Sequence, residues 1–512
     1  MTRMLARIWT LALDFNVDGA AHRIRFNLLL PLALFAQGLL LFSHLDLLDA
    51  WGDEIFTQNV VTRSLREIVP ILQHDIHPPL YFFLLHGWTR IPLPWTGIAA
   101  LRAFSAVMAL LSTVLFDQFW LRRWRPAHRG LALALFVFSP CLLLYGRMAR
   151  SYSMQTALAI AALFLLWHWA KNPRAVFARG LPAWATLVLL LYTHYLPGLA
   201  ILAGFVLTAA RRLGLIRMAA FLTATLAAYA PWIPTLAGSF DSWRHAAGYD
   251  LTPSPLLEQA LKLSFAITSL SIGESFAPVV LLLVPAIIWI AWRGWRVRTP
   301  RPSPLPMVAA AIAGYIGAVR WVAWPFVAAR LLWLLPFLIL AITIGLLRFR
   351  TPARSALAAA ILLAFASSTF FYFRRENFVN LGYVAPVREI ANRVRSEASP
   401  RDVVLADASN ADSEAIRYYL GNGLKLVPLH AGSAVPVKEA TSAADAGTIW
   451  IVRNTRDVSP GGFLTALATE ACRGRASSET FYEPYPAWER AAMKIVAGIP
   501  APQYFYQLTV CR

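Results

Sequence analysis

Long apolar stretches separated by short polar connections recur along most of this 512-residue chain. Stretches of about 17 to 25 mostly apolar residues have the length that a helix needs to cross the ~30 Å hydrocarbon core of a membrane. Such windows lie at 27–45, 97–120, 131–146, 152–170, 181–195, 196–210, 217–237, 276–292, 307–324, 330–347 and 355–373. The pattern therefore predicts eleven transmembrane helices.

Two further apolar stretches do not fit as spans. The segments 78–91 (PPLYFFLLHGWTRI) and 256–272 (LLEQALKLSFAITSLSI) are short or carry a charge near the middle. Counting either one as a span would also move a basic connection to the opposite side of the membrane. We therefore predict two helices that lie along the outer membrane surface or dip partly into it.

The composition supports a membrane protein, because 58% of the residues are hydrophobic, only 14% are charged and the mean hydropathy is +0.53. The net charge of +20 comes from arginines that gather in short clusters at every second connection between the apolar stretches. This is the pattern of cytoplasmic loops, so the N-terminus is predicted to be cytoplasmic, and nucleic acid is not expected as a partner. The first apolar stretch is expected to remain as an anchor.

The composition changes after about residue 373. The segments RDVVLADA, KLVPL, GTIWIVR and QYFYQLTV are typical of strands, and SEAIRYYL and FLTALATEA of helices. The predicted fold is a polytopic α-helical membrane domain, 1–373, followed by a small extracytoplasmic α/β domain, 374–512. Cys472 and Cys511 both fall in this second domain, where a disulfide is a hypothesis that the sequence leaves open.

Unusual polar residues gather on the outward connections of the predicted topology. Each has a plain structural explanation: solvated loop acids, prolines that turn the chain, arginines that anchor at headgroups, and a histidine packed in an interfacial turn. They also have the chemistry of a site for a phosphate-containing ligand, with carboxylates for proton transfer and guanidinium groups for an anion. The candidates are Asp53, Glu54, Asp75, His77, Arg147, Arg150, His194 and Arg330.

The order and sidedness of these features resemble the GT-C membrane glycosyltransferases, in the branch of the protein O-mannosyltransferases and aminoarabinose transferases. The resemblance covers about residues 27–350. It rests on the Asp-Glu pair in WGDEIFT after the first span, the D-x-H-P-P-L-Y segment that ends at Tyr81, the R-x-x-R pair in YGRMARSY, the T-H-Y turn in YTHYLPG, and the late arginine in ARLLWLLP. Many relatives have an aromatic residue after that late arginine, and this chain does not.

The resemblance implies transfer of a sugar from a polyprenyl-phosphate carrier, with inversion, to a lipid, glycan or protein hydroxyl at the extracytoplasmic face of a bacterial-type inner membrane. It makes Asp53 the catalytic base and Glu54 its neighbour that assists or positions. The residues that it makes candidates to neutralise the carrier phosphate are His77, Arg147, Arg150 and Arg330. Asp75 and His194 complete the predicted substrate-binding set. Neither a cofactor nor an obligatory metal is expected.

Two other function classes stay open. A transporter or flippase of a lipid-linked sugar also needs many spans and basic residues, but it predicts ionisable residues near the middle of the membrane and repeated halves. A non-enzymatic envelope assembly factor would work through the C-terminal domain, in which the sequence shows no nucleophile motif. The position of the charges at one outer face favours the transferase.

Overall fold

The computed structural model describes residues 28–75, 77–238, 256–296, 305–317, 327–407, 412–429, 447–455, 472, 476–487, 490–491, 494 and 503–512. The chain divides into two compact units. The helical unit comprises Met1–Leu45 and Val60–Asn377, and the sheet unit comprises Asp46–Asn59 and Phe378–Arg512. The expected division into 1–373 and 374–512 stays a prediction.

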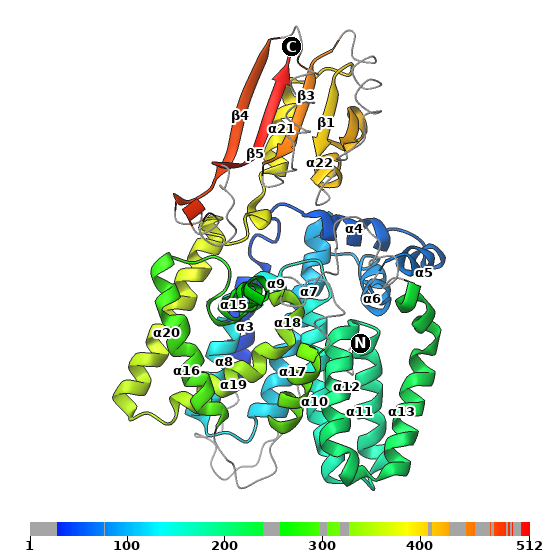
Figure 1. Ribbon diagram of the computed structural model, residues 1–512, viewed down its shortest axis with the longest axis vertical. Coiled ribbons are helices and arrows are strands. Elements are labelled where there is room, and N and C mark those ends of the chain that lie inside the picture. The colour runs from blue at the N-terminus through cyan, green and yellow to red at the C-terminus, as the bar shows by residue number, and fades with distance from the viewer. Residues whose placement is uncertain are drawn as a thin grey trace. The chain divides into compact units, whose positions relative to one another are not determined.

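Helices occupy each of the eleven predicted windows (Figure 1). They are α3 (Leu29–Phe42), α7 (Gly97–Leu115) with η1 (Phe116–Leu121), α8 (Pro126–Val137), α9 (Pro140–Gly146), α10 (Tyr152–Lys171), α11 (Leu181–Leu191), α12 (Tyr195–Leu213), α13 (Leu215–Tyr229), α16 (Val284–Trp295), α17 (Leu305–Gly317), α19 (Leu335–Leu346) and α20 (Thr351–Arg374). In the described residues, four further α-helices lie between the windows: α4 (Gly52–Val61), α5 (Leu65–Gln73), α6 (Leu80–Trp88) and α15 (Leu256–Ile272). The short helix α18 (Ala328–Leu331) begins just before the window at 330–347 and overlaps it.

Seven described helices are long and apolar enough to cross a membrane. An eighth results if α8 and α9, which are bent by 49° at Ser139, form one span. Pro140 at the start of α9 explains this bend, because it has no N–H to continue the hydrogen bonds of α8. Shorter apolar helices fill the windows at 27–45 and 181–195. The multi-span fold is confirmed, and the number eleven stays a prediction.

Small residues let the helices approach at their backbones. A Cβ atom added at Gly294 of α16 would collide with the carbonyl of Ala341 in α19, and one added at Gly345 would collide with the carbonyl of Ile290. The two glycines therefore face each other's helices across one contact. Close backbone contacts of this kind are typical of membrane helices, which cannot rely on the hydrophobic effect to associate.

The sheet unit is built on five strands, β1 (Val403–Asp407), β2 (Lys425–Leu429), β3 (Ile449–Asn454), β4 (Ser477–Pro484) and β5 (Tyr504–Cys511). Their order is β2-β1-β3-β5-β4, in which β1 runs parallel to β2 and β3, while β5 runs antiparallel to β3 and β4 (Figure 1). The helices α21 (Val387–Glu397) and α22 (Asp412–Leu420) complete the described part of the unit. The predicted α/β domain is confirmed, although β4 and α21 are additions to it. The helix expected at FLTALATEA lies outside the described residues.

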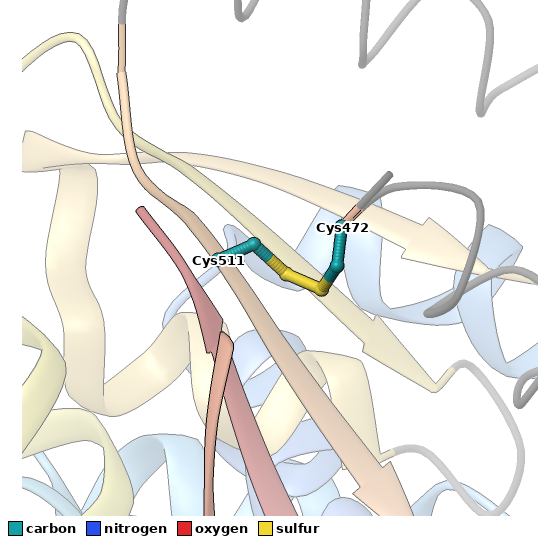
Figure 2. The surroundings of a disulfide bond; sticks show 2 residues. All are labelled: Cys472 and Cys511. Carbon is teal, nitrogen blue, oxygen red and sulfur yellow. A yellow bond between two sulfur atoms is a disulfide. The ribbon is translucent and has the colours of Figure 1, made fainter. Parts of the chain in front are cut away.

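A disulfide joins Cys472 to Cys511 at the end of β5 (Figure 2). The two Cα atoms are 5.2 Å apart, within the ordinary range for a disulfide. The structure thus contains the bond that the sequence left open. Cys141, the third cysteine, is a buried thiol in α9.

Candidate functional site

The acid pair lies in the first turn of α4, in the sheet unit. The carbonyl of Trp51 accepts the Glu54 N–H at 2.9 Å and so begins the helix, and the Thr57 hydroxyl donates to the Asp53 carbonyl at 2.8 Å. Acids favour this position because helix N-termini carry a partial positive charge. Glu54 is fully buried, whereas Asp53 is partly exposed. Of the two, Asp53 is therefore better placed to meet a hydroxyl group from outside the protein.

In the helical unit, three charged or polar side chains form a chain of hydrogen bonds. Asp75 Oδ2 lies 2.6 Å from His77 Nδ1, and His77 Nε2 lies 2.6 Å from Arg150 Nη2. A guanidinium nitrogen can only donate, so Nε2 must accept and Nδ1 must carry the imidazole proton, which it donates to Asp75. We assign His77 as the neutral Nδ1–H tautomer. The charges of Asp75 and Arg150 then balance.

Backbone contacts hold this chain in place. The Ser105 hydroxyl of α7 donates to the Arg150 carbonyl at 3.2 Å and lies 3.4 Å from the hydroxyl of Tyr81 in α6. The Leu80 N–H at the start of α6 donates to the Tyr192 carbonyl at 3.1 Å, in the turn before α12. That contact brings HPPLY beside YTHY. It also occupies the first N–H of α6.

His194 and Arg330 belong to the same group of residues. His194 is 8% exposed, and its burial together with the nearby charges of Arg330 and Arg150 holds its pKa well below its usual value. It is therefore neutral at pH 7. Arg330 lies in α18, where the Ala329 carbonyl accepts a hydrogen bond from Gln155 at 2.8 Å. We call Asp75, His77, Arg150, His194 and Arg330 the cationic cluster. With both histidines neutral, it carries one net positive charge.

Arg147 does not point into the cationic cluster. The residues 147–151 form a turn between α9 and α10, so Arg147 and Arg150 do not lie on one helical face. The Arg147 guanidinium donates to the carbonyl of Leu40, in the last turn of α3, at 2.8 Å, and to that of His44, just after the helix. It also stacks over the ring of Phe373. These contacts satisfy backbone carbonyls at a helix end. Arg147 therefore ties α3 to α20.

A further acid, Glu274, is not among the candidate residues predicted from the sequence. It lies in SIGESF after α15, is 2% exposed and accepts a hydrogen bond from the Tyr145 hydroxyl of α9. Burial raises its pKa to about 7, although hydrogen bonds from Tyr145 and Ser269 oppose the shift. The available signal was an acid beside the apolar helix that the sequence predicts at the outer membrane surface. The sequence could not show that the loop folds inward.

The loop that carries Glu274 is fixed by its neighbours. Gly273 has φ +85° and packs so closely on Pro140 that a Cβ atom would collide with that ring. The Ser275 hydroxyl donates to the Glu376 carbonyl at 2.8 Å, and Ser368 donates to the Ile272 carbonyl at 2.7 Å. The buried carboxyl is therefore part of a rigid segment, packed between α9 and the end of α20.

No protein-family model and no curated protein matches the sequence. Solved structures do. The crystal structure of ArnT from Cupriavidus metallidurans in the apo state covers 96% of this chain and 98% of its own, at 14% identity and a TM-score of 0.55. The same protein bound to undecaprenyl phosphate covers 94% and 97%, at 13% identity and a TM-score of 0.51. The chain therefore has the fold of ArnT, an aminoarabinose transferase, which is the fold that its resemblance to the GT-C membrane glycosyltransferases implies.

Proposed function

We propose that this protein transfers a sugar from a polyprenyl-phosphate-linked donor to a hydroxyl acceptor at the extracytoplasmic membrane face, with inversion at the anomeric carbon. The observation that carries the proposal is the cationic cluster in a chain with the ArnT fold. The ArnT crystal structure with undecaprenyl phosphate shows that this fold accommodates a lipid phosphate in that relative. The acceptor is a lipid, a glycan or a protein hydroxyl.

The charge of the cationic cluster suits this reaction. A phosphodiester-linked donor carries one negative charge, and the departing lipid phosphate gains a second. A site with net positive charge favours the state in which negative charge develops, and so lowers the barrier. Arg150 and Arg330 supply that charge in the proposal, while the neutral His194 contributes a hydrogen bond without a charge. Arg147 is left out, because carbonyl groups already occupy its terminal nitrogens.

The acid pair supplies the base. Asp53 removes the proton from the acceptor hydroxyl while the acceptor oxygen attacks the anomeric carbon, and the bond between that carbon and the phosphate oxygen breaks. Glu54 assists by holding the first turn of α4 in place. The role of Asp53 rests on the sequence resemblance and on its partial exposure at the helix start. The Cys472–Cys511 disulfide supports an oxidising, and hence extracytoplasmic, compartment for the sheet unit.

A direct test uses the full chain in nanodiscs, supplied with polyprenyl-phospho-sugars and a lipid extract from the source cells. Mass spectrometry should detect sugar on an acceptor together with free polyprenyl phosphate, and NMR should show an inverted anomeric centre. Asp53→Asn should reduce the rate by at least about a hundredfold, as loss of a general base does. Arg123→Gln, which removes an exposed arginine outside the cationic cluster, is the matched control.

Two results would reject this function. Normal transfer by Asp53→Asn would remove the catalytic base. Movement of the lipid-linked sugar across the bilayer without any new glycosidic bond would favour the flippase instead.

A further inference from the structure

The segment before the acid pair is bound to the sheet unit by a set of contacts at Asp49. The Asp49 carboxylate is buried, with 5% of its side chain exposed. Its Oδ2 accepts the backbone N–H of Arg388 at 2.9 Å, and its Oδ1 lies 3.3 Å from Arg388 Nε. The Arg388 Nη2 donates to the Asp46 carbonyl at 2.9 Å. One arginine thus holds both ends of the turn at 46–49.

This arrangement caps α21 from a distant part of the chain. Arg388 is the second residue of α21, and the residue before the helix is Pro386, whose side chain cannot accept a hydrogen bond. The N–H groups of a first helical turn have no partner within the helix, and the helix dipole favours an anion there. Asp49 supplies that anion across a sequence separation of 339 residues.

A second contact lies next to the first. The Tyr419 hydroxyl of α22 accepts the Ala50 N–H at 2.7 Å, and the Arg388 guanidinium stacks over the Tyr419 ring, 5.4 Å from its centroid. The ring of Trp51 packs edge-on against Tyr383 at 6.1 Å. Residues 46, 49, 50 and 51 are therefore all fixed to the sheet unit, immediately before α4 begins at Gly52.

We propose that Arg388 and Tyr419 are positioning residues for the acid pair, and that the sheet unit exists in part to set where α4 begins and which way Asp53 points. The proposal rests on the proposed function, since it assigns Asp53 a role in transfer. Trp51 links the two, because its carbonyl accepts the N–H groups of Glu54 and Ile55 that start the helix. When a catalytic group is misplaced, the rate of the reaction falls far more than the affinity for the substrate.

The experiment compares Arg388→Gln with Arg393→Gln in the full chain. Arg393 is the matched control, since it lies on the same helix, its side chain is equally exposed at 35%, and it contacts Thr480 and Tyr482 but not the segment 46–59. Arg388→Gln should lower kcat by roughly tenfold to a hundredfold, with the donor KM within about twofold of wild type. Arg393→Gln should leave kcat near wild type.

Amide hydrogen exchange over residues 50–58 provides a readout that does not depend on transfer. Exchange there should become about tenfold faster in Arg388→Gln than in Arg393→Gln, because opening of the first turn of α4 becomes easier. Unchanged exchange in Arg388→Gln, or an equal loss of kcat in both variants, would overturn the positioning role. Faster exchange in a protein whose wild type transfers no sugar would reject the proposed function and leave the positioning contact standing.

Discussion

His77 Nε2 lies 2.6 Å from Arg150 Nη2, so the imidazole accepts from a cation and cannot itself be protonated at that nitrogen. The R-x-x-R pair is thereby divided between two tasks. Arg150 faces the His77–Asp75 pair, while Arg147 holds the end of α3. The division means that two arginines three positions apart should respond differently to the same substitution.

Arg150→Gln should weaken binding of a polyprenyl phosphate by about tenfold to a hundredfold, because a charge-assisted hydrogen bond contributes about 1.5–3 kcal/mol. The thermal midpoint should also fall, because the change leaves the Asp75 carboxylate without the charge that balances it. Arg147→Gln should lower the unfolding free energy by about 2–4 kcal/mol while the affinity for lipid phosphate stays close to wild type. Lipid titration and thermal unfolding in detergent measure the two effects. Equal loss of lipid affinity in both variants would contradict the division.

Glu274→Gln should stabilise the protein in a pH-dependent way. The pKa of Glu274 is about 7 in the folded protein against 4.5 for an exposed glutamate, so the folded state holds the proton more tightly. The stability of the wild type is therefore greatest below about pH 4.5 and falls as the pH rises toward 7. The difference in unfolding free energy between Glu274→Gln and the wild type should grow over that window to an order of 3 kcal/mol. Thermal unfolding at pH 5 and pH 8 measures this difference. Glu376→Gln, at an exposed acid nearby, is the control. An advantage equal at both pH values would show that Glu274 is not protonated by burial.

Asp117→Asn should destabilise the helical unit by about 3–5 kcal/mol, since it leaves the charge of Arg129 uncompensated. The Asp117 carboxylate has no exposed surface and pairs with Arg129 through two contacts, at 2.5 and 2.6 Å. Replacing both residues, Asp117→Asn with Arg129→Gln, should cost less than the sum of the single changes. Additive losses in thermal unfolding would mean that the pair is not energetically coupled.

Replacing both bonded cysteines, Cys472→Ser with Cys511→Ser, should lower the unfolding free energy of the sheet unit by about 4 kcal/mol, because the bond closes a loop with a sequence separation of 39 residues. Thiol labelling of the wild type without reductant should modify neither of these cysteines. Labelling of both would show that the bond does not form in the protein. The buried Cys141, replaced by Ser, serves as the control for labelling.

Apolar patterning predicted the helices well, because a membrane span must be continuous and apolar, and this requirement is local. The same applies to β3 and β5, which are buried along most of their length and read as apolar runs. β4 could not be recognised, because SSETFYEP is a largely exposed edge strand with little apolar character. Its partner β5 defines it, and that pairing is not a local property.

The candidate site was predictable in part, because polar residues at the ends of apolar stretches are also a local signal. Asp75, His77, Arg150, His194 and Arg330 stand out as polar residues at outward helix ends, and the structure brings them together. The direction of Arg147 depends on the turn at 147–151, for which one sequence holds no signal.

The first turn of α21 is capped by Asp49, which lies far away in the sequence, and this also sets an order of assembly. Asp49 is synthesised before most of the helical unit, whereas Arg388 and Tyr419 are synthesised after it. The contacts of Asp49 and Ala50 with these two residues therefore form only after α21 and α22 have been made. A chain that stops before Arg388 would insert its spans and still lack the contacts that hold the segment before α4.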